Sequence, residues 1–280
     1  MPDDGIDITA PRLDHDIRTA AIAVLATGDA RAKAAKALAV AAAWRAGELD
    51  TDRDAATAPP ERPARPARPV LVQPGAVPRR RVNSAPAGRI ALLHALAHIE
   101  LNAIDLAWDM LARFSSAELP RRFIDDWVSV GAEEARHFIA LADRLEALGT
   151  AYGDLPAHDG LWLSALATAH DLAARLAVVP LVLEARGLDV TPAMAVRLRR
   201  VGDAPSADIL DTIYSEEIGH VAIGQRWFSF VCAARGAEPR HLWQNLVGRY
   251  FHGTLKRPFN ESGRDAAGLP ESWYAALAKP

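Results

Sequence analysis

Residues 125–138, DDWVSVGAEEARHF, and residues 212–228, TIYSEEIGHVAIGQRWF, decide the fold. Each stretch contains a Glu-x-x-His motif, Glu134 with His137 and Glu217 with His220, among apolar residues three or four positions apart. That spacing is typical of one face of an α-helix. Because residues three apart project from nearly the same side of a helix, each Glu should lie beside its His on the inward face.

Two more helical stripes each contain a Glu where the period calls for an apolar residue. These are Glu100, in a helix that begins at about Gly88, and Glu184, in a helix over residues 160–187. Glu100 lies 34 residues before Glu134, and Glu184 lies 33 residues before Glu217, so a Glu followed by Glu-x-x-His occurs twice. This internal duplication of a helix pair predicts an all-α fold with a four-helix bundle at residues 88–234.

Four buried carboxylates repel one another and lose their hydration. Protonation relieves some of this cost, but two divalent cations neutralise all four charges while the histidines stay neutral. Oxygen and imidazole donors suit iron or manganese and, less selectively, zinc. One Glu-x-x-His motif alone means little, and a single Glu can lie at the edge of an apolar stripe. The duplicated pattern predicts a di-metal site formed by Glu100, Glu134, His137, Glu184, Glu217 and His220.

The rest of the chain divides by composition into segments around the bundle. Residues 1–50 form an N-terminal helical extension, Ala-rich over 13–48, with a break at Gly28 and a stop at Gly47. Residues 51–87 are rich in Pro and Arg and predict an extended surface connector, or else a disordered linker. Residues 192–201 predict a short helix or turn. Residues 235–280 form a C-terminal tail that packs on the bundle, with helices near 240–252 and through Trp273 and an irregular stretch between them.

Composition narrows the class of protein. Half of the 280 residues are hydrophobic, only 6% are aromatic, and the net charge is -3, which argues against a general nucleic-acid-binding protein. The single Cys excludes an intrachain disulfide. We see no signal peptide, and no stretch of about 18 residues is free of charge, so we expect a cytoplasmic protein without a membrane span.

The chain resembles the ferritin-like superfamily of carboxylate-bridged di-metal proteins and, within it, a bacterial family of unknown function. The similarity covers nearly the whole chain. It lies in residues 65–80, RPARPVLVQPGAVPRR, in residues 92–110, LLHALAHIELNAIDLAWDM, in the two opening stretches, in residues 156–162, PAHDGLW, in residues 178–192, VVPLVLEARGLDVTP, and in LKRPFN at 255–260. The resemblance implies the ferritin-like fold and the six ligands, and the narrower family supplies no reaction of its own. A more distant similarity, mainly in the ligand pattern, is to the di-iron hydroxylase that modifies tRNA.

Several residues near the predicted ligands have a possible supporting role. In similar di-iron oxygenases an Asp precedes the ligand Glu and anchors a His, so we expect Glu133 and Glu216 each to reach the His of the opposite motif. Ordinary solvated glutamates are the alternative. Tyr214, one helical turn before Glu217, is expected to donate a hydrogen bond to a carboxylate or to act in redox chemistry.

For two other groups of polar residues near the bundle, the sequence leaves a functional and a structural role open. His94, His98 and His170 form either a polar cluster or ordinary core and surface histidines. The connector arginines, among them Arg62, Arg65, Arg68 and Arg79–Arg81, either contact RNA or dock on bundle carboxylates.

The resemblance implies an oxygen-activating oxidoreductase with two iron ions, or with manganese or a mixed iron-manganese pair. Its partners would be dioxygen, a small organic substrate and an electron donor, with a homodimer as the expected oligomer. The catalytic residues stay unassigned. Alternatives are iron oxidation without an organic substrate, a di-manganese catalase, and a tRNA hydroxylase. Pro180, Gly187 and Gly219 indicate room beside the ligands, which predicts an apolar pocket with the tail or connector at its mouth.

Overall fold

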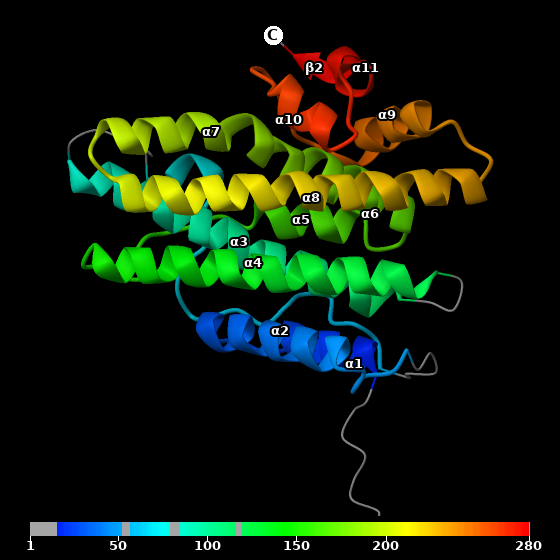
Figure 1. The fold of residues 1–280 in the computed structure, drawn as a ribbon, viewed down its shortest axis with the longest axis horizontal. Helices are drawn as coiled ribbons and strands as arrows, with labels where there is room; N and C mark the ends of the chain where they lie inside the picture. Colours follow the sequence, from blue (N-terminus) through cyan, green and yellow to red (C-terminus); the bar gives the residue numbers. More distant parts are fainter. Residues whose placement is uncertain (1–15, 52–56, 79–84, 116–118, 280) are drawn as a thin grey trace, which may run out of the picture.

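Four long helical segments run side by side and form the body of the molecule (Figure 1). The computed structural model describes residues 16–51, 57–78, 85–115 and 119–279. The bundle comprises α3 (Pro86–Phe114), α4 (Arg121–Ala147), the interrupted segment α6 (Leu172–Val178), η2 (Val179–Glu184) and α7 (Ala185–Arg200), and α8 (Ala204–Ala234). The described strands are two short ones, β1 (Leu255–Lys256) and β2 (Ala278–Lys279), which pair in parallel. The all-α class predicted from the sequence is confirmed.

Local signals position the ends of the bundle helices. The Asp203 side chain accepts a hydrogen bond from the Ser206 backbone N–H and so caps the start of α8. The same carboxylate pairs with Arg144, 2.7 Å away near the end of α4. Helix α4 ends just before Gly149, whose positive φ of 78° suits a residue without a side chain. These caps align the ends of α4 and α8, the two helices that carry the Glu-x-x-His motifs.

The third bundle helix differs from the predicted continuous helix over 160–187. Helix α5 (Gly160–Ala167) ends early, and Asp171 caps a new start by accepting from the Ala173 N–H. Pro180 has no N–H to donate, and the helix widens there into the π turn η2, which ends at Glu184. The Trp243 indole donates to the Ala177 carbonyl beside this turn, at 3.1 Å.

Helix α7 then continues to Arg200, so the short helix or turn predicted at 192–201 is part of a longer helix. Pro192 lies inside α7 and cannot donate to the Leu188 carbonyl, four residues earlier. The Asn260 side-chain amide donates to that carbonyl instead, at 3.0 Å. A residue of the C-terminal tail therefore replaces the hydrogen bond that Pro192 removes.

The N-terminal helices pack against the outside of α3 and α4 (Figure 1). Helices α1 (Ile17–Leu25) and α2 (Ala30–Arg45) are separated at the predicted break, where Asp29 caps α2. Buried Lys33 of α2 forms an ion pair with buried Asp105 of α3 and donates to the Ala64 carbonyl of the connector, at 2.8 Å. One ammonium group thus joins the extension, the connector and the bundle.

The described part of the connector, residues 57–78, runs along the surface with one short turn, η1 (Pro74–Ala76). Arg62 pairs with Asp159 at 2.5 Å, and Arg65 pairs with Asp105 at 3.0 Å. These contacts match the predicted docking of connector arginines on bundle carboxylates. Arg79–Arg81 lie outside the described residues.

The tail folds over α7 and α8 and contains a helix that the sequence prediction missed. It comprises α9 (Pro239–Tyr250), β1, α10 (Glu261–Ala266), α11 (Glu271–Tyr274), η3 (Ala275–Leu277) and β2. Helix α10 lies in the stretch predicted to be irregular, and Asn260 caps it. Buried Arg264 of α10 forms a two-pronged ion pair with Asp189 of α7, at 2.8 and 2.7 Å. This pair fixes the tail to the bundle.

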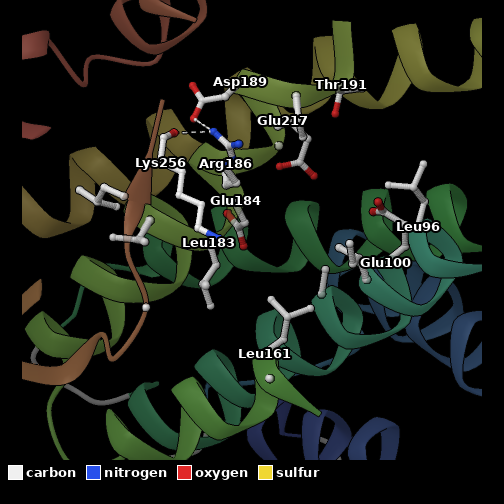
Figure 2. A pocket seen from close by; sticks show the side chains of 18 of the residues that line it. Leu96, Glu100, Leu161, Leu183, Glu184, Arg186, Asp189, Thr191, Glu217 and Lys256 are labelled. Carbon is white, nitrogen blue, oxygen red and sulfur yellow. Dashed lines mark hydrogen bonds and ion pairs between the residues drawn. The ribbon is translucent and has the colours of Figure 1, made fainter. Parts of the chain in front are cut away.

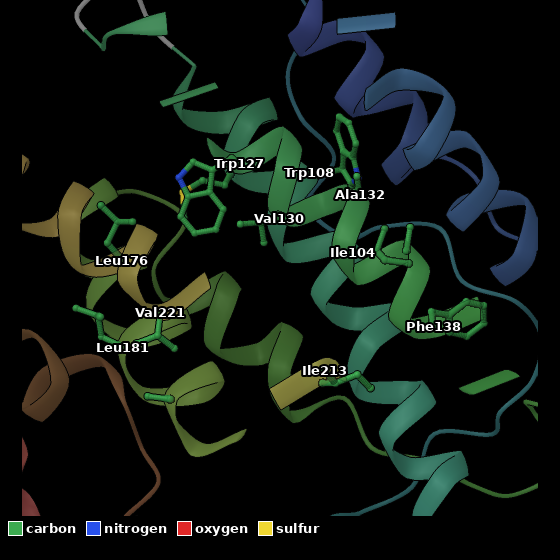
Figure 3. Packing of buried hydrophobic residues seen from close by; sticks show 14 of the residues in the cluster. Ile104, Trp108, Trp127, Val130, Ala132, Phe138, Leu176, Leu181, Ile213 and Val221 are labelled. Atoms are coloured by element: carbon green, nitrogen blue, oxygen red, sulfur yellow. The ribbon is translucent and has the colours of Figure 1, made fainter. Parts of the chain in front are cut away.

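Apolar side chains fill the space between the bundle helices (Figure 3). Trp108, Trp127 and Trp227 are buried in this core. Two glycines allow close packing, because an added Cβ would lie 2.7 Å from the Trp108 indole nitrogen at Gly131 and 2.3 Å from Pro180 Cβ at Gly224. Helix α3 is long and apolar enough to cross a membrane, yet 83% of its most apolar window is buried inside the protein.

Candidate metal centre

The bundle brings the predicted ligands together in its interior. Buried Glu100 comes from α3, Glu134 and His137 from α4, and Glu217 and His220 from α8. One ligand atom from each of Glu100, Glu134, His137 and Glu217 lies within 4.8 Å of all the others. Such a group could hold a metal ion.

The two histidines present equivalent nitrogens to this cluster. His137 Nδ1 lies 3.3 Å from Glu100 Oε2 and 3.4 Å from Glu134 Oε2. His220 Nδ1 lies 3.0 Å from Glu134 Oε1 and 3.4 Å from Glu217 Oε1. In both rings Nδ1 faces the carboxylates, so Nδ1 is the nitrogen available to a metal ion.

The other ring nitrogens bond to outer glutamates in the crosswise arrangement predicted from the sequence. His137 Nε2 donates to Glu216 Oε2 at 2.7 Å, and His220 Nε2 donates to Glu133 Oε2 at 2.8 Å. A carboxylate that holds one ring N–H fixes the orientation of the imidazole and leaves the opposite nitrogen free to coordinate. The side chains of Glu216 and Glu133 are long enough to reach the opposite rings.

Arg136 was not anticipated from the sequence. Its guanidinium lies 3.6 Å from Glu133 and 3.8 Å from Glu216 and so bridges the two outer carboxylates at the protein surface. The signal that was available is its spacing, three residues after Glu133 on the same helix.

Several buried polar atoms in the cluster have no hydrogen-bond partner among the described residues. They are both carboxylate oxygens of Glu134, Oε2 of Glu184, Oε2 of Glu217 and Nδ1 of His220. Glu184 is half-buried as a residue, but its Oε2 is fully enclosed. Buried polar atoms without partners are rare and need an explanation, and here the atoms concerned are the ones that would coordinate a cation.

Burial and mutual repulsion disfavour the charged form of three of the carboxylates. Burial and the Glu134 charge raise the pKa of Glu100 well above its ordinary value. Burial and the Glu217 charge do the same for the pKa of Glu184, with Glu134 and Glu100 adding to the effect. Burial and Glu134 also raise the pKa of Glu217. Glu184 lines the same pocket wall as Glu100 and Glu217 (Figure 2).

Ion pairing opposes burial at the remaining groups. Burial alone would raise the pKa of Glu134, but interactions with His220 and His137 outweigh it and lower that pKa. Burial alone would lower the pKa of His137, but its interactions with Glu100 and Glu134 raise it well above the ordinary value. The pKa of His220 is raised in the same way, chiefly by Glu217 and Glu134. Without metal, protons therefore occupy the positions where cations would bind.

The donor set fits divalent metal ions. Four carboxylates and two imidazole nitrogens are hard to borderline ligands that suit iron and manganese and also accept zinc. The residues present therefore match the predicted metal site, and the donors alone leave the identity of the metal open.

The predicted hydrogen bond from Tyr214 to a ligand carboxylate is not found among the described residues. The Tyr214 hydroxyl accepts a hydrogen bond from the Asn260 side chain at 2.9 Å, so it fixes the tail. The proposed histidine cluster is also absent among the described residues. His94 and His98 are buried near Tyr152, whereas His170 is exposed and contacts Tyr250.

A pocket of about 760 Å³ lies against the cluster. Figure 2 shows three of the carboxylates, Glu100, Glu184 and Glu217, at its wall. Its other walls come from α3, α5, α7 and α8, with tail segment 251–259 and Pro74 of the connector also lining it. The predicted pocket, lined from the first, third and fourth bundle helices with tail and connector beside it, is present.

The part of the pocket wall that comes from α7 beyond residue 187 was not predicted from the sequence. Val190, Thr191 and Met194 line the pocket there, in a stretch predicted to be outside the third helix. The available signal was the apolar period, because buried Leu188, Ala195 and Leu198 continue one helical face.

Comparisons with known proteins place the chain in a family. A protein from Haemophilus influenzae, described as uncharacterized, is 41% identical over 208 residues, which cover 72% of each chain. No solved structure matches the chain. The family model described as "Protein of unknown function (DUF455)" matches residues 26–275, nearly the whole length, and the chain therefore belongs to that family.

Proposed function

We propose that this protein is a ferritin-like di-metal oxidoreductase that uses dioxygen to oxidise an organic substrate. Two iron ions are the cofactor we favour, with manganese or a mixed pair as the alternative. The support is the arrangement of one Glu from each of two helices and a Glu-x-x-His motif from each of the other two. Di-iron and di-manganese carboxylate proteins of the ferritin-like class share this ligand pattern.

The pocket is the observation that carries the choice of an organic substrate. Its volume of about 760 Å³ falls within the range of small-molecule sites, and it reaches three of the six candidate ligands. A protein that only oxidises and stores iron needs a narrow path for ions. An apolar chamber that meets Glu100, Glu184 and Glu217 supports chemistry on a carbon compound.

Residues at different positions around the site would have different roles in this function. Glu133 and Glu216 hold the histidine rings so that Nδ1 faces inward. Glu100, Glu184 and Glu217 would connect the ions to the pocket, and apolar residues such as Leu161 and Ile213 would exclude water from the substrate. When bound, the two ions would supply the electrons and the Lewis acidity that dioxygen activation requires.

The first test measures metal content. After anaerobic loading with Fe²⁺ and removal of the excess, elemental analysis should approach two ions per chain. The bound metal should also raise the melting temperature, because a ligand that binds only the folded state stabilises it. A folded protein that retains one ion or none, with an unchanged melting temperature, would contradict the proposal.

The second test measures the reaction. The reduced iron-loaded protein should consume dioxygen faster when a suitable apolar compound is present, and Glu184→Ala should abolish that acceleration. Dioxygen consumption that no organic compound changes would favour iron oxidation instead. Rapid disproportionation of hydrogen peroxide by the manganese-loaded protein would favour a catalase.

A further inference from the structure

We propose that the pocket binds an amphipathic molecule whose apolar body lies along the metal centre and whose anionic head group pairs with Lys256. This inference rests on the proposed function and names the substrate class for the same site. Three observations support the inference: the position of Lys256, the contacts that hold its backbone in place, and the charges around the pocket.

Lys256 extends along the wall of the pocket that Leu183 and Glu184 also line (Figure 2). No carboxylate among the described residues lies within ion-pair distance of its ammonium group. The side chain is exposed, whereas the preceding residue, Leu255, is buried. The ammonium is therefore available to a molecule that enters the pocket.

The backbone at Lys256 is held in place. Arg186 Nη1 donates to the Lys256 carbonyl at 2.8 Å and to the Pro258 carbonyl at 3.2 Å. Strand β1 also pairs with β2, with Lys256 in register with Lys279. The position of Lys256 over the pocket is thus supported from two sides, by the bundle and by the end of the tail.

The charges around the pocket favour an anion once the site holds metal. Two divalent ions would neutralise Glu100, Glu134, Glu184 and Glu217. Asp189 is then the one remaining acidic residue in the lining, against the basic residues Arg186, Arg264 and Lys256. Arg264 and Arg186 share the carboxylate of Asp189, at 2.7 and 3.3 Å. Three basic groups against one acidic group leave the lining net positive, and Lys256 is the one of the three without a carboxylate partner among the described residues.

The body of the ligand must be mainly apolar. Aliphatic residues such as Leu106, Leu161, Val182 and Ile213 line the pocket between the carboxylates and the tail. Burial of a hydrocarbon against these walls is favourable in proportion to the area removed from water. The pocket has the volume of a drug-sized ligand and so has room for a molecule much larger than dioxygen or peroxide.

Binding to the Mn²⁺-loaded full-length protein tests this inference without turnover. Decanoate, decyl phosphate, 1-decanol and decylamine share one apolar chain and differ in head group, and calorimetric titration gives each dissociation constant. We expect either anion to bind at least about fivefold more tightly than 1-decanol, and decylamine to bind most weakly. The better anion distinguishes a carboxylate from a phosphate head group.

Variants identify the residue responsible. Lys256→Ala should remove the preference for the anion, and Lys256→Arg should retain it. Arg257→Ala is the matched control, because Arg257 is an exposed neighbour that stacks on Phe259 and does not line the pocket. Equal affinity for 1-decanol and decanoate, no binding of any probe, or a preference that survives Lys256→Ala would overturn the inference. Manganese content measured on the same samples keeps this failure distinct from failure of the metal site.

Discussion

Replacing either outer glutamate, Glu133 or Glu216, should weaken metal binding although all six candidate ligands remain. In Glu216→Ala, His137 loses the acceptor of its Nε2–H, and in Glu133→Ala, His220 loses its acceptor. A hydrogen bond to a charged group contributes about 1.5–3 kcal/mol, which corresponds to about 10- to 100-fold in affinity. Glu216 is 32% exposed and Glu133 is 26% exposed, so water replaces part of the interaction. We therefore expect the lower end, about a tenfold rise in the dissociation constant for each.

Conservative variants separate the charge from the orientation of the ring. Glu216→Gln and Glu133→Gln keep an oxygen that can accept from Nε2 but lose the negative charge, so we expect about a threefold effect. In the double alanine variant the two factors should multiply approximately, because each carboxylate contacts a different histidine. Arg136, which contacts both, is the one link between them.

The assay is an anaerobic competition titration of Mn²⁺ against a chelating dye, with thermal melting of each metal-free variant as the check on folding. Glu146→Ala is the control, since Glu146 is an exposed residue of α4 that pairs with Arg31. The reasoning is refuted if both alanine variants, folded as the parent protein is, bind Mn²⁺ within about twofold of its affinity.

Other predictions concern stability. Gly224→Ala should destabilise the fold by about 1–3 kcal/mol in thermal melting, because its Cβ would lie 2.3 Å from Pro180 Cβ. Gly219→Ala on the same helix should be neutral or slightly stabilising, since nothing lies within 4 Å of the added carbon, and equal losses would contradict this reasoning. Burial lowers the pKa of His94 from 6.5 to about 4. The neutral ring, which accepts from a backbone N–H, therefore stabilises the fold fully above pH 6.5 and loses this contribution as pH falls toward 4. His94→Leu should flatten the dependence of urea unfolding on pH in this window, and an unchanged slope would exclude the effect. Arg175→Met should cost about 3–5 kcal/mol in chemical denaturation, because it leaves a buried aspartate without its closest cation, and a loss under about 1 kcal/mol would show that pair to be replaceable.

The four-helix bundle and the cluster of ligand residues could be predicted from the sequence because both depend on helical periodicity. Glu134 and His137 lie three residues apart on a face that also holds Phe138 and Leu141, so one helix is enough to predict their direction. The crosswise contacts of Glu133 and Glu216 were also predictable, since the two motifs are duplicates that face each other across α4 and α8. Such features can be predicted from local residue spacing and from the expectation that two duplicated motifs pack against each other.

The third bundle helix was predicted less well because its hydrogen bonds come from distant residues. Pro192 indicates a helix end, yet Asn260 replaces the missing donor and α7 continues. The identity of that donor is not encoded near residue 192. The contact of Tyr214 with the tail was not predicted for the same reason, because its partner is again Asn260. Asn260 of the tail thus makes two contacts with the bundle that the sequence did not predict.

The π turn before Glu184 makes the two halves of the bundle unequal. The repeated ligand pattern resembles an approximate twofold symmetry, yet the helix that carries Glu100 is continuous and its counterpart is interrupted beside Pro180. The pocket reaches Glu100, Glu184 and Glu217 but none of Glu134, His137 and His220. The symmetry of the ligands is therefore broken by the backbone, and the centre has one face toward an apolar chamber and another toward a charged surface.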